Sequence, residues 1–194
     1  MRIPNIHAVH LDPVELEIIN SFLVLMIRTG YKQVTMQHII QSSDLTKSQM
    51  YRRFASKDDL VCRLLLAHEM ELSEHLDQWL QLEPFDKVID SYLQFLLKHP
   101  DKFKLIQSLE VLAETEFGEK EQAIQWQRLK ARNLLRLDNE LTKSKPAISL
   151  PGCGFYLIHC LLRGLGQTQR QNYFADPGLT VAQVKQCILK LVSR

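Results

Sequence analysis

The apolar residues recur at helical spacing along the whole chain, and no stretch alternates apolar and polar residues as a strand does. A first helix is predicted from Pro13 to the glycine at position 30. Two short helices follow after Thr35 and Thr46, and a long one covers residues 57–82. Further helices are predicted at residues 85–99, 101–117, 119–143, 153–169 and 180–192. The pattern therefore predicts an all-α protein with about nine helices.

Four helix starts in the first third of the chain have a residue that can cap the helix. Asp12 precedes Pro13, and Thr35, Thr46 and Ser56 each precede a helical apolar pattern. A side-chain oxygen at this position accepts a hydrogen bond from an otherwise unpaired backbone N–H group. The starts of the first four helices are thus predicted closely from sequence alone.

The two short helices have the plan of a helix-turn-helix. The polar turn Ser43-Asp44 separates them, and apolar residues on both sides can hold the helices at an angle; these are Ile39, Leu45, Met50 and Phe54. The second helix would present residues that commonly contact phosphates and base edges, with no acidic residue among them: Lys47, Ser48, Gln49, Tyr51, Arg52 and Arg53. In such a motif the second helix enters the major groove of DNA.

This stretch resembles the DNA-binding signature of the TetR family of transcriptional regulators. The resemblance spans about 45 residues and rests on Gly30-Tyr31, Thr35, Ile39, Leu45-Thr46-Lys47, Tyr51-Arg52-Arg53-Phe54 and Ser56-Lys57-Asp58-Asp59-Leu60. It implies a regulator, typically a repressor, that binds a palindromic double-stranded DNA operator and is released by a small-molecule effector. The chain departs from the family at Ser43-Asp44, where Ala-Gly is usual, and at Ser48 and Gln49, which bear on the target sequence.

The candidate DNA-binding residues divide into two predicted roles. Lys47, Gln49 and Arg52 are expected to face the groove or its edges. Thr35, Tyr51 and Lys57 are expected to hold phosphates, Lys57 because the family's docking mode points its ammonium group at the DNA. The full candidate set is Thr35, Thr46, Lys47, Ser48, Gln49, Tyr51, Arg52, Arg53 and Lys57.

The net charge of +2 conceals an uneven distribution. Residues 28–57 carry six basic residues and one acidic residue, whereas residues 64–118 carry four basic and eleven acidic residues. Residues 119–194 are again basic, with twelve basic and five acidic residues. A basic patch at the helix-turn-helix favours binding to a polyanion.

Two predicted domains are joined by the long helix over residues 57–82. Residues 1–57 form the predicted DNA-binding domain, and residues 58–194 a helical regulatory and dimerisation domain. Of the last two predicted helices, the one at 153–169 is apolar on most of its surface, and the one at 180–192 carries a single apolar stripe. They can form the core of one chain, or the four-helix dimer interface that the resemblance implies.

A ligand pocket is one interpretation of the aromatic residues in the second domain; a packed core is the other. The candidate pocket residues are Tyr92, Phe95, Phe103, Trp126 and Tyr156. His68 and His75 lie seven residues apart with Glu71 between them. We interpret them as histidines on a polar helix face and expect no metal site.

No catalytic motif is present, so an enzyme is not expected, and the sequence predicts no cofactor. The N-terminus lacks the pattern of a secretion signal, and no apolar run is long enough to span a membrane, which favours a cytoplasmic protein. Two alternatives to a ligand-responsive regulator remain. One is a helical DNA-binding protein that acts through a protein partner without an inducer, and the other is an enzyme or small-molecule carrier.

Overall fold

All regular structure in the described part of the chain is helical, as the sequence predicts. The computed structural model describes residues 10–81, 85–97 and 100–144, together with residues 159, 160, 186 and 190. Seven α-helices and one 3-10 helix lie in these residues: α1 (Pro13–Thr29), η1 (Tyr31–Gln33), α2 (Met36–Gln41), α3 (Lys47–Arg53), α4 (Lys57–Trp79), α5 (Phe85–Leu97), α6 (Pro100–Glu116) and α7 (Glu121–Ser144). The predicted helices at 153–169 and 180–192 fall outside the described residues, apart from residues 159, 160, 186 and 190, which are helical.

The chain divides into two compact units. Unit 1 consists of Met1–Glu71 and Ser108–Leu129, and unit 2 of Leu72–Gln107 and Lys130–Arg194. Unit 1 therefore contains α1 to α3, most of α4, the second half of α6 and the start of α7. These units reflect packing, so the functional boundary predicted at residue 57 stays a prediction.

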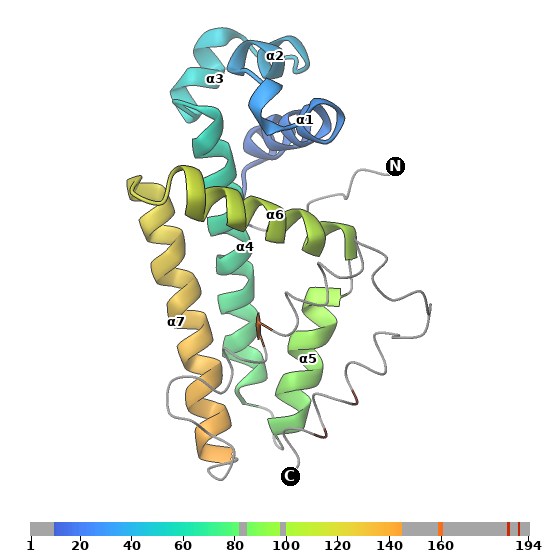
Figure 1. The fold of residues 1–194 in the computed structure, drawn as a ribbon, viewed down its shortest axis with the longest axis vertical. Helices are drawn as coiled ribbons and strands as arrows, with labels where there is room; N and C mark the ends of the chain where they lie inside the picture. Colours follow the sequence, from blue (N-terminus) through green and yellow to red (C-terminus); the bar gives the residue numbers. More distant parts are fainter. Residues whose placement is uncertain are drawn as a thin grey trace. The chain divides into compact units, whose positions relative to one another are not determined.

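The helix starts in unit 1 are fixed by the caps that the sequence predicts. Asp12 accepts hydrogen bonds from the backbone N–H groups of Val14 and Glu15, and the Glu15 carboxylate accepts one from the N–H of Asp12. α4 has the same reciprocal arrangement between Ser56 and Asp59. Figure 1 shows α1, α2 and α3 gathered around the start of α4.

The guanidinium group of Arg63 joins α4 to α1. It donates to both carboxylate oxygens of Glu15, at 3.1 and 3.2 Å, and to the carbonyl of His10 at 2.6 Å. A bidentate pair of this kind fixes orientation as well as distance. α1 is thereby held against α4 by a polar contact in addition to its buried residues Ile18, Ile19, Phe22 and Leu23.

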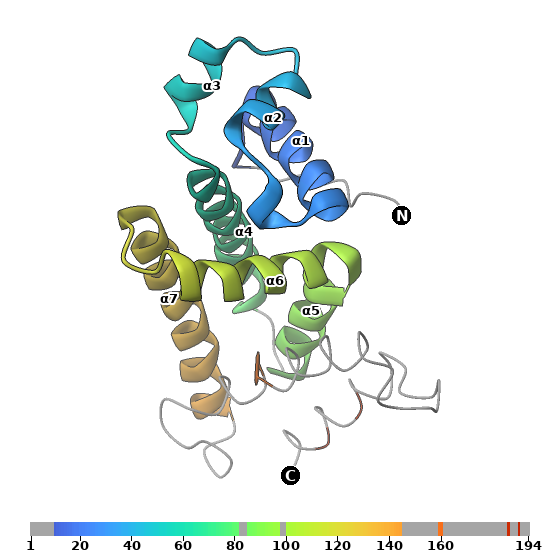
Figure 2. The same cartoon turned by 45° about the horizontal axis from the view of Figure 1, so that its top comes forward.

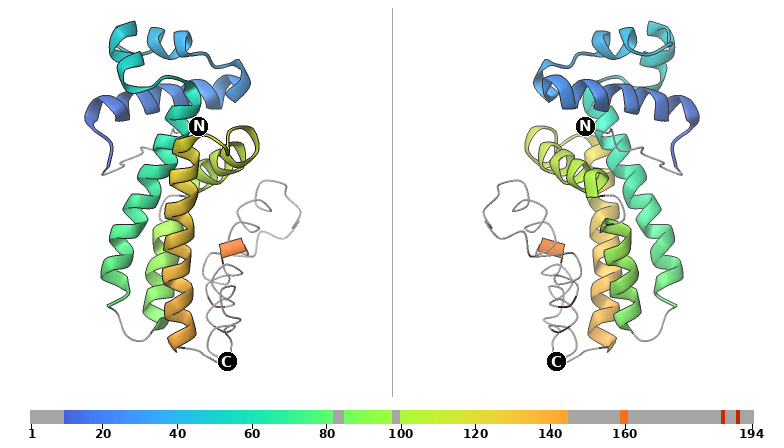
Figure 3. Two further views of the ribbon diagram at one scale, coloured as in Figure 1. Left: turned by 90° about the vertical axis from the view of Figure 1, so that its left-hand side faces the viewer. Right: turned by 90° about the vertical axis from the view of Figure 1, so that its right-hand side faces the viewer.

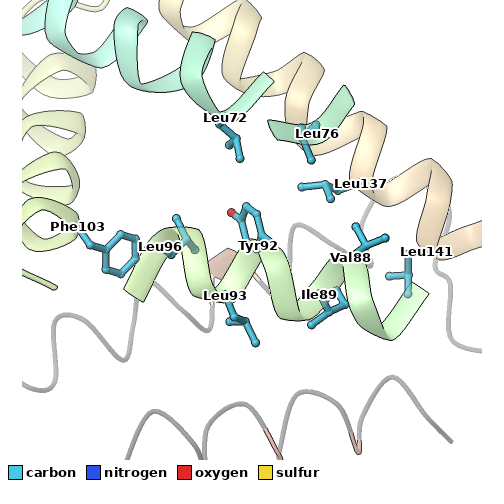
Figure 4. Packing of buried hydrophobic residues seen from close by; sticks show 10 residues of the cluster. All are labelled: Leu72, Leu76, Val88, Ile89, Tyr92, Leu93, Leu96, Phe103, Leu137 and Leu141. Carbon is cyan, nitrogen blue, oxygen red and sulfur yellow. The ribbon is translucent and has the colours of Figure 1, made fainter. Parts of the chain in front are cut away.

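Unit 2 is organised around a cluster of ten buried hydrophobic residues. The end of α4, α5 and α7 run side by side in Figure 3. Figure 4 shows the cluster side chains on these helices and on α6, with Tyr92 pointing from α5 toward α4 and α7, and Ile89 and Leu93 on the opposite side of α5. The cluster consists of Leu72, Leu76, Val88, Ile89, Tyr92, Leu93, Leu96, Phe103, Leu137 and Leu141. Their removal from water supplies the main driving force for folding this unit.

Three sequence predictions need correction. α4 ends at Trp79, three residues before the predicted end. The helix predicted at 101–117 begins one residue earlier, at Pro100, the first position of α6, where proline is tolerated because its N–H would be unpaired in any case. His68 is buried rather than on a polar face, and the ring of His75 stacks on Trp79 with centroids 5.1 Å apart.

Candidate nucleic-acid interface

The start of each helix in the helix-turn-helix is capped by the threonine that the sequence predicts. The hydroxyl of Thr35 accepts a hydrogen bond from the N–H of His38 at 3.2 Å, which begins α2. The hydroxyl of Thr46 accepts one from the N–H of Gln49 at 3.3 Å, which begins α3. Both threonines are exposed, so their positions are set by the caps rather than by burial.

Apolar residues hold the two helices together, as predicted. Ile39 and Met50 are fully buried and Phe54 nearly so, while Leu45 in the turn is half-buried. Met50 is the only buried residue of α3. α3 is therefore anchored through one side chain, and most of its surface is left to the solvent.

The exposed residues of α3 are those that the sequence predicts for DNA contact. Lys47, Ser48, Gln49, Tyr51 and Arg52 are all exposed, and Tyr51 has 44% of its surface accessible. Figure 2 shows α3 at the outer edge of this group of helices. The structure thus brings these five residues to one exposed helix, whose contacts with DNA remain predictions.

Two basic residues of α3 already have partners within unit 1. The Lys47 ammonium lies 5.9 Å from the centre of the Tyr51 ring. The Arg53 guanidinium lies 3.7 Å from the Asp12 carboxylate, which caps α1. Arg53 is half-buried, so it links α3 to the first helix while Lys47 remains exposed.

Gln49 has a structural role that the sequence analysis did not assign. Its side-chain oxygen accepts hydrogen bonds from the N–H of Thr46 at 2.8 Å and from the Thr46 hydroxyl at 2.9 Å. This completes a capping box at the start of α3. The oxygen is committed to the cap, so the NH₂ group is the part of Gln49 that can address a base, as a donor.

Lys57 is the candidate whose surroundings differ most from the expectation. Its ammonium group donates to the carbonyl of Tyr31 at 2.8 Å and to the carbonyl of Val34 at 3.0 Å. It also lies 4.2 Å from the centre of the Tyr31 ring. The predicted phosphate contact is untested, but in this structure the ammonium is engaged within the protein.

Next to Lys57, the carboxylate of Asp58 joins three segments of unit 1. One oxygen accepts a hydrogen bond from the Tyr31 hydroxyl, and the other pairs with the ammonium of Lys120, in the turn between α6 and α7. The Tyr31 ring also contacts Phe22 and Phe117, with centroids 6.3 and 6.4 Å away. Tyr31 is therefore held through its carbonyl, its ring and its hydroxyl.

The protonation states of this cluster follow from its contacts. Burial alone would raise the pKa of Asp58, but the hydrogen bonds from Lys120 and Tyr31 outweigh it and lower the pKa below its usual value. Burial and the neighbouring carboxylate raise the pKa of the Tyr31 hydroxyl far above its usual value. The hydrogen bond to Asp58 raises the pKa of Lys120. At neutral pH, Asp58 and Lys120 are charged and Tyr31 is neutral.

Sequence reasoning missed this cluster because its members are far apart in the chain. In the sequence, Tyr31 and Asp58 stand out only as parts of the family signature. Lys120 carried no signal, since a lone lysine after Gly118 is typical of a turn. Pairing over 62 positions is visible only in three dimensions.

The predicted pocket residues are not all in one unit. Tyr92, Phe95 and Phe103 belong to unit 2, where Tyr92 and Phe103 are part of the hydrophobic cluster and Phe95 packs against it. The Tyr92 hydroxyl also hydrogen-bonds to Nδ1 of His159 at 3.0 Å. Trp126 belongs to unit 1 and is fully buried, and Tyr156 lies outside the described residues.

The described residues contain no group of three or more His, Cys, Asp or Glu side chains that could hold a metal ion. None of the helices traced there combines the length and the apolar character needed to cross a membrane.

Comparison with solved structures shows that the fold is known. The structure is similar to that of AmtR from Mycobacterium smegmatis, with a TM-score of 0.65 and 14% sequence identity, covering 94% of this chain and 87% of that one. A TetR-family regulator from Syntrophomonas wolfei gives a TM-score of 0.61 at 15% identity, covering 92% of both chains. The fatty acid degradation regulator FadR from Bacillus halodurans gives 0.62 at 15% identity, covering 94% and 95%.

Sequence comparison locates the similarity in the DNA-binding region. No curated protein matches the chain. Residues 18–64 match the family model described as "Bacterial regulatory proteins, tetR family", and this range contains the capped helices, the exposed α3 and Lys57. The match agrees with the exposed helix-turn-helix and with the fold of the solved regulators. Residues 18–64 therefore match the TetR family of bacterial regulatory proteins and are the DNA-binding region of a transcriptional regulator, in a chain that has the fold of the solved regulators.

Proposed function

We propose that this protein is a repressor that binds a palindromic operator as a dimer and is released by a small-molecule ligand. The observation that carries the DNA-binding part is α3, which is capped at its start, anchored through Met50 and otherwise exposed. Its exposed residues include two cations, an amide and two hydroxyl groups, and no carboxylate. Such a helix suits the major groove, where base edges offer both donors and acceptors.

The proposed contacts follow the chemistry of the side chains. Lys47, Gln49 and Arg52 address base edges, with Ser48 beside them. Tyr51 and Thr35 hold phosphates, and Thr46 contributes mainly by starting α3. Arg53 is half-buried beside Asp12, so we assign it a supporting contact at the edge of the interface.

Dimerisation is proposed from the sequence pattern of residues 153–169 and 180–192, which lie outside the described residues. One helix-turn-helix reads a half-site, and two of them spaced by about 34–36 Å or a multiple read a palindrome. A charge in the middle of the first apolar stretch, as in Leu161→Glu, should separate the subunits because burying an unpaired carboxylate is costly. Light scattering that gives a monomer mass for the unmodified protein at micromolar concentration would exclude the dimer.

The effector is proposed to bind in unit 2 beside the aromatic residues Tyr92 and Phe103 of the hydrophobic cluster and Phe95, which packs against it. α4 begins with Lys57 in unit 1 and ends in unit 2, so a ligand that tilts its far end can change the DNA-binding end. A coupling free energy of about 1–3 kcal/mol is enough for a 5–150-fold response.

The experiment that tests this function begins by selecting operator duplexes from a random-sequence pool with the purified protein. Sequence-selective binding that weakens with salt is expected, and its absence would favour an enzyme or carrier. Candidate effectors found by thermal shift are then titrated with and without the selected duplex. Because coupling is reciprocal, the duplex must weaken ligand binding by the factor by which the ligand weakens DNA binding. Equal ligand affinities would favour the alternative, a DNA-binding protein that acts through a protein partner.

A further inference from the structure

We propose that Lys57 is a positioning residue of the DNA-binding region, and that it acts by fixing the turn before α2 rather than by neutralising a phosphate. The inference rests on the proposed function for its DNA-binding consequence. Its structural part rests on the two carbonyl groups and the aromatic ring that surround the Lys57 ammonium. Amide hydrogen exchange of the protein without DNA tests this structural part separately.

The segment that Lys57 holds is a single 3-10 turn with few bonds of its own. Gly30 enters it with a φ of 84°, and the N–H of Val34 reaches the carbonyl of Tyr31 only at 3.3 Å. The carbonyls of Tyr31 and Val34 converge on one point, where the ammonium donates to both. Without the Lys57 ammonium, these two carbonyl groups would lose the hydrogen-bond donor that they share. Such a loss is costly here because Tyr31 and Lys57 are half-buried.

The position of this turn determines where α2 begins. Val34 is nearly fully buried, and the next residue, Thr35, is the N-cap of α2 and a proposed phosphate contact. A shift of the Val34 carbonyl therefore moves the Thr35 hydroxyl and the first turn of α2. Lys57 is the first residue of α4, and its hydrogen bond to the Val34 carbonyl ties the start of α2 to the start of α4, across 23 positions of the chain.

The neighbouring residue reinforces the same contact. Asp58 accepts a hydrogen bond from the Tyr31 hydroxyl, while the Tyr31 ring packs edge-on against Phe22. Two consecutive residues of α4 thus bind Tyr31: Lys57 donates a hydrogen bond to its carbonyl, and Asp58 accepts one from its hydroxyl. For Lys57 to bind a phosphate with its full set of donors, it would have to leave two charge-assisted hydrogen bonds and an aromatic face.

The two roles predict different salt dependences of DNA binding. Each phosphate neutralised by a cation contributes about 0.9 to the slope of log affinity against log salt. A positioning residue contributes to affinity but not to this slope. The test compares Lys57→Met, which keeps most of the side-chain length but removes the ammonium, with Lys57→Arg, which retains charge and donors. Lys87→Met, at an exposed lysine of α5, is the control for losing a charge elsewhere.

Affinity is measured for a duplex that the unmodified protein selects from a random pool, at several salt concentrations and at a temperature where every variant is folded. We expect Lys57→Met to bind roughly 10-fold more weakly at each salt concentration with an unchanged slope, and Lys57→Arg to recover most of the loss. A slope that becomes shallower by about one in Lys57→Met would overturn the proposal. An affinity equal to that of Lys87→Met would also overturn it.

Amide hydrogen exchange without DNA provides the second arm. Lys57→Met should accelerate exchange at the start of α2, in particular at the Ile39 N–H that bonds to the Thr35 carbonyl at 3.2 Å, whereas Lys87→Met should not. Unchanged protection at Ile39 would contradict the positioning role. If the unmodified protein selects no duplex at all, the proposed function fails, and the exchange measurement still decides whether Lys57 fixes the turn.

Discussion

The helix-turn-helix region of unit 1 and the core of unit 2 both bury aliphatic and aromatic side chains, but their polar residues differ. In unit 1, polar side chains form caps and ion pairs between specific positions, as in Thr46 with Gln49 and Asp58 with Lys120. The unit 2 cluster consists of hydrophobic residues, and the Tyr92 hydroxyl is its one polar side-chain group. A directional bond requires a particular residue at a particular place, whereas apolar packing accepts many substitutions of similar volume.

The family match covers residues 18–64, which include the capped helices, and does not extend into unit 2. The DNA-binding region must present the same polar geometry to the same kind of partner, and its sequence carries that requirement. A core of leucine, valine and isoleucine can change its sequence while the fold persists, as the 14–15% identity to regulators of the same fold illustrates. Fold similarity alone therefore identifies no effector.

The largest expected effect concerns the unit 2 core. Leu137→Ala removes a fully buried side chain of α7 and should lower the free energy of unfolding by about 2–5 kcal/mol, because it leaves a cavity. Leu135→Ala, two residues away on the same helix at an exposed position, should have little effect. Urea unfolding measures both. Equal losses in the two variants would mean that the burial assigned to α7 is wrong.

A smaller effect is expected from the backbone at Gly30. Its φ of 84° is rare for any residue with a side chain, yet the space around it is open, so the cost of Gly30→Ala comes from the backbone alone. We expect a loss of about 1–2 kcal/mol, with part of the DNA affinity lost as well because η1 begins at the next residue. Thermal unfolding and DNA titration check the two parts. A fully stable Gly30→Ala protein would contradict the positive φ.

The helix caps and the contacts of Asp58 show which features of unit 1 can be predicted from sequence. The caps at Thr35, Thr46 and Ser56 were predicted correctly because each involves partners three residues apart. The bond from Tyr31 to Asp58 and the ion pair of Asp58 with Lys120 join residues 27 and 62 positions apart, and no local pattern encodes them. The helix predicted at 101–117 includes Pro100 as well, because proline disfavours the interior of a helix but is accepted in its first turn.

The Asp58 cluster predicts a dependence of stability on pH. The pKa of Asp58 is lowered in the folded protein, so its stabilising contribution is complete above its unfolded value of about 3.9 and is lost as the pH falls through the folded pKa. Asp58→Asn should therefore cost about 1 kcal/mol at neutral pH, the order expected for a partly exposed ion pair with one hydrogen bond. The difference from the unmodified protein should shrink as the pH falls below 4. A difference that stays constant down to pH 3 would show that Asp58 does not act through its charge.

The smallest change in stability is expected at Gln49. Gln49→Ala should lose about 0.5–1 kcal/mol because it removes half of the capping box, and it should relax discrimination at one or two base pairs. Gln49→Glu keeps an acceptor for Thr46 but removes the donor NH₂ group, so it should preserve stability while weakening DNA binding. Competition with single-base operator variants measures discrimination. Loss of stability in Gln49→Glu equal to that in Gln49→Ala would contradict the cap.

The turn between α6 and α7 has a consequence for building chimeric regulators. Phe117 and Lys120 come from this turn, yet they complete the surroundings of Tyr31 within unit 1. A fusion that joins residues 1–57 of this chain to a foreign regulatory domain would omit Asp58, Phe117 and Lys120 together. Tyr31 would then keep its contacts with Lys57 and Phe22 but lose its hydroxyl partner and one face of its ring. A transplant that retains DNA specificity therefore has to carry Asp58 together with residues 108–129, or Asp58 with a foreign turn redesigned to supply an aromatic side chain and a cation at the same places.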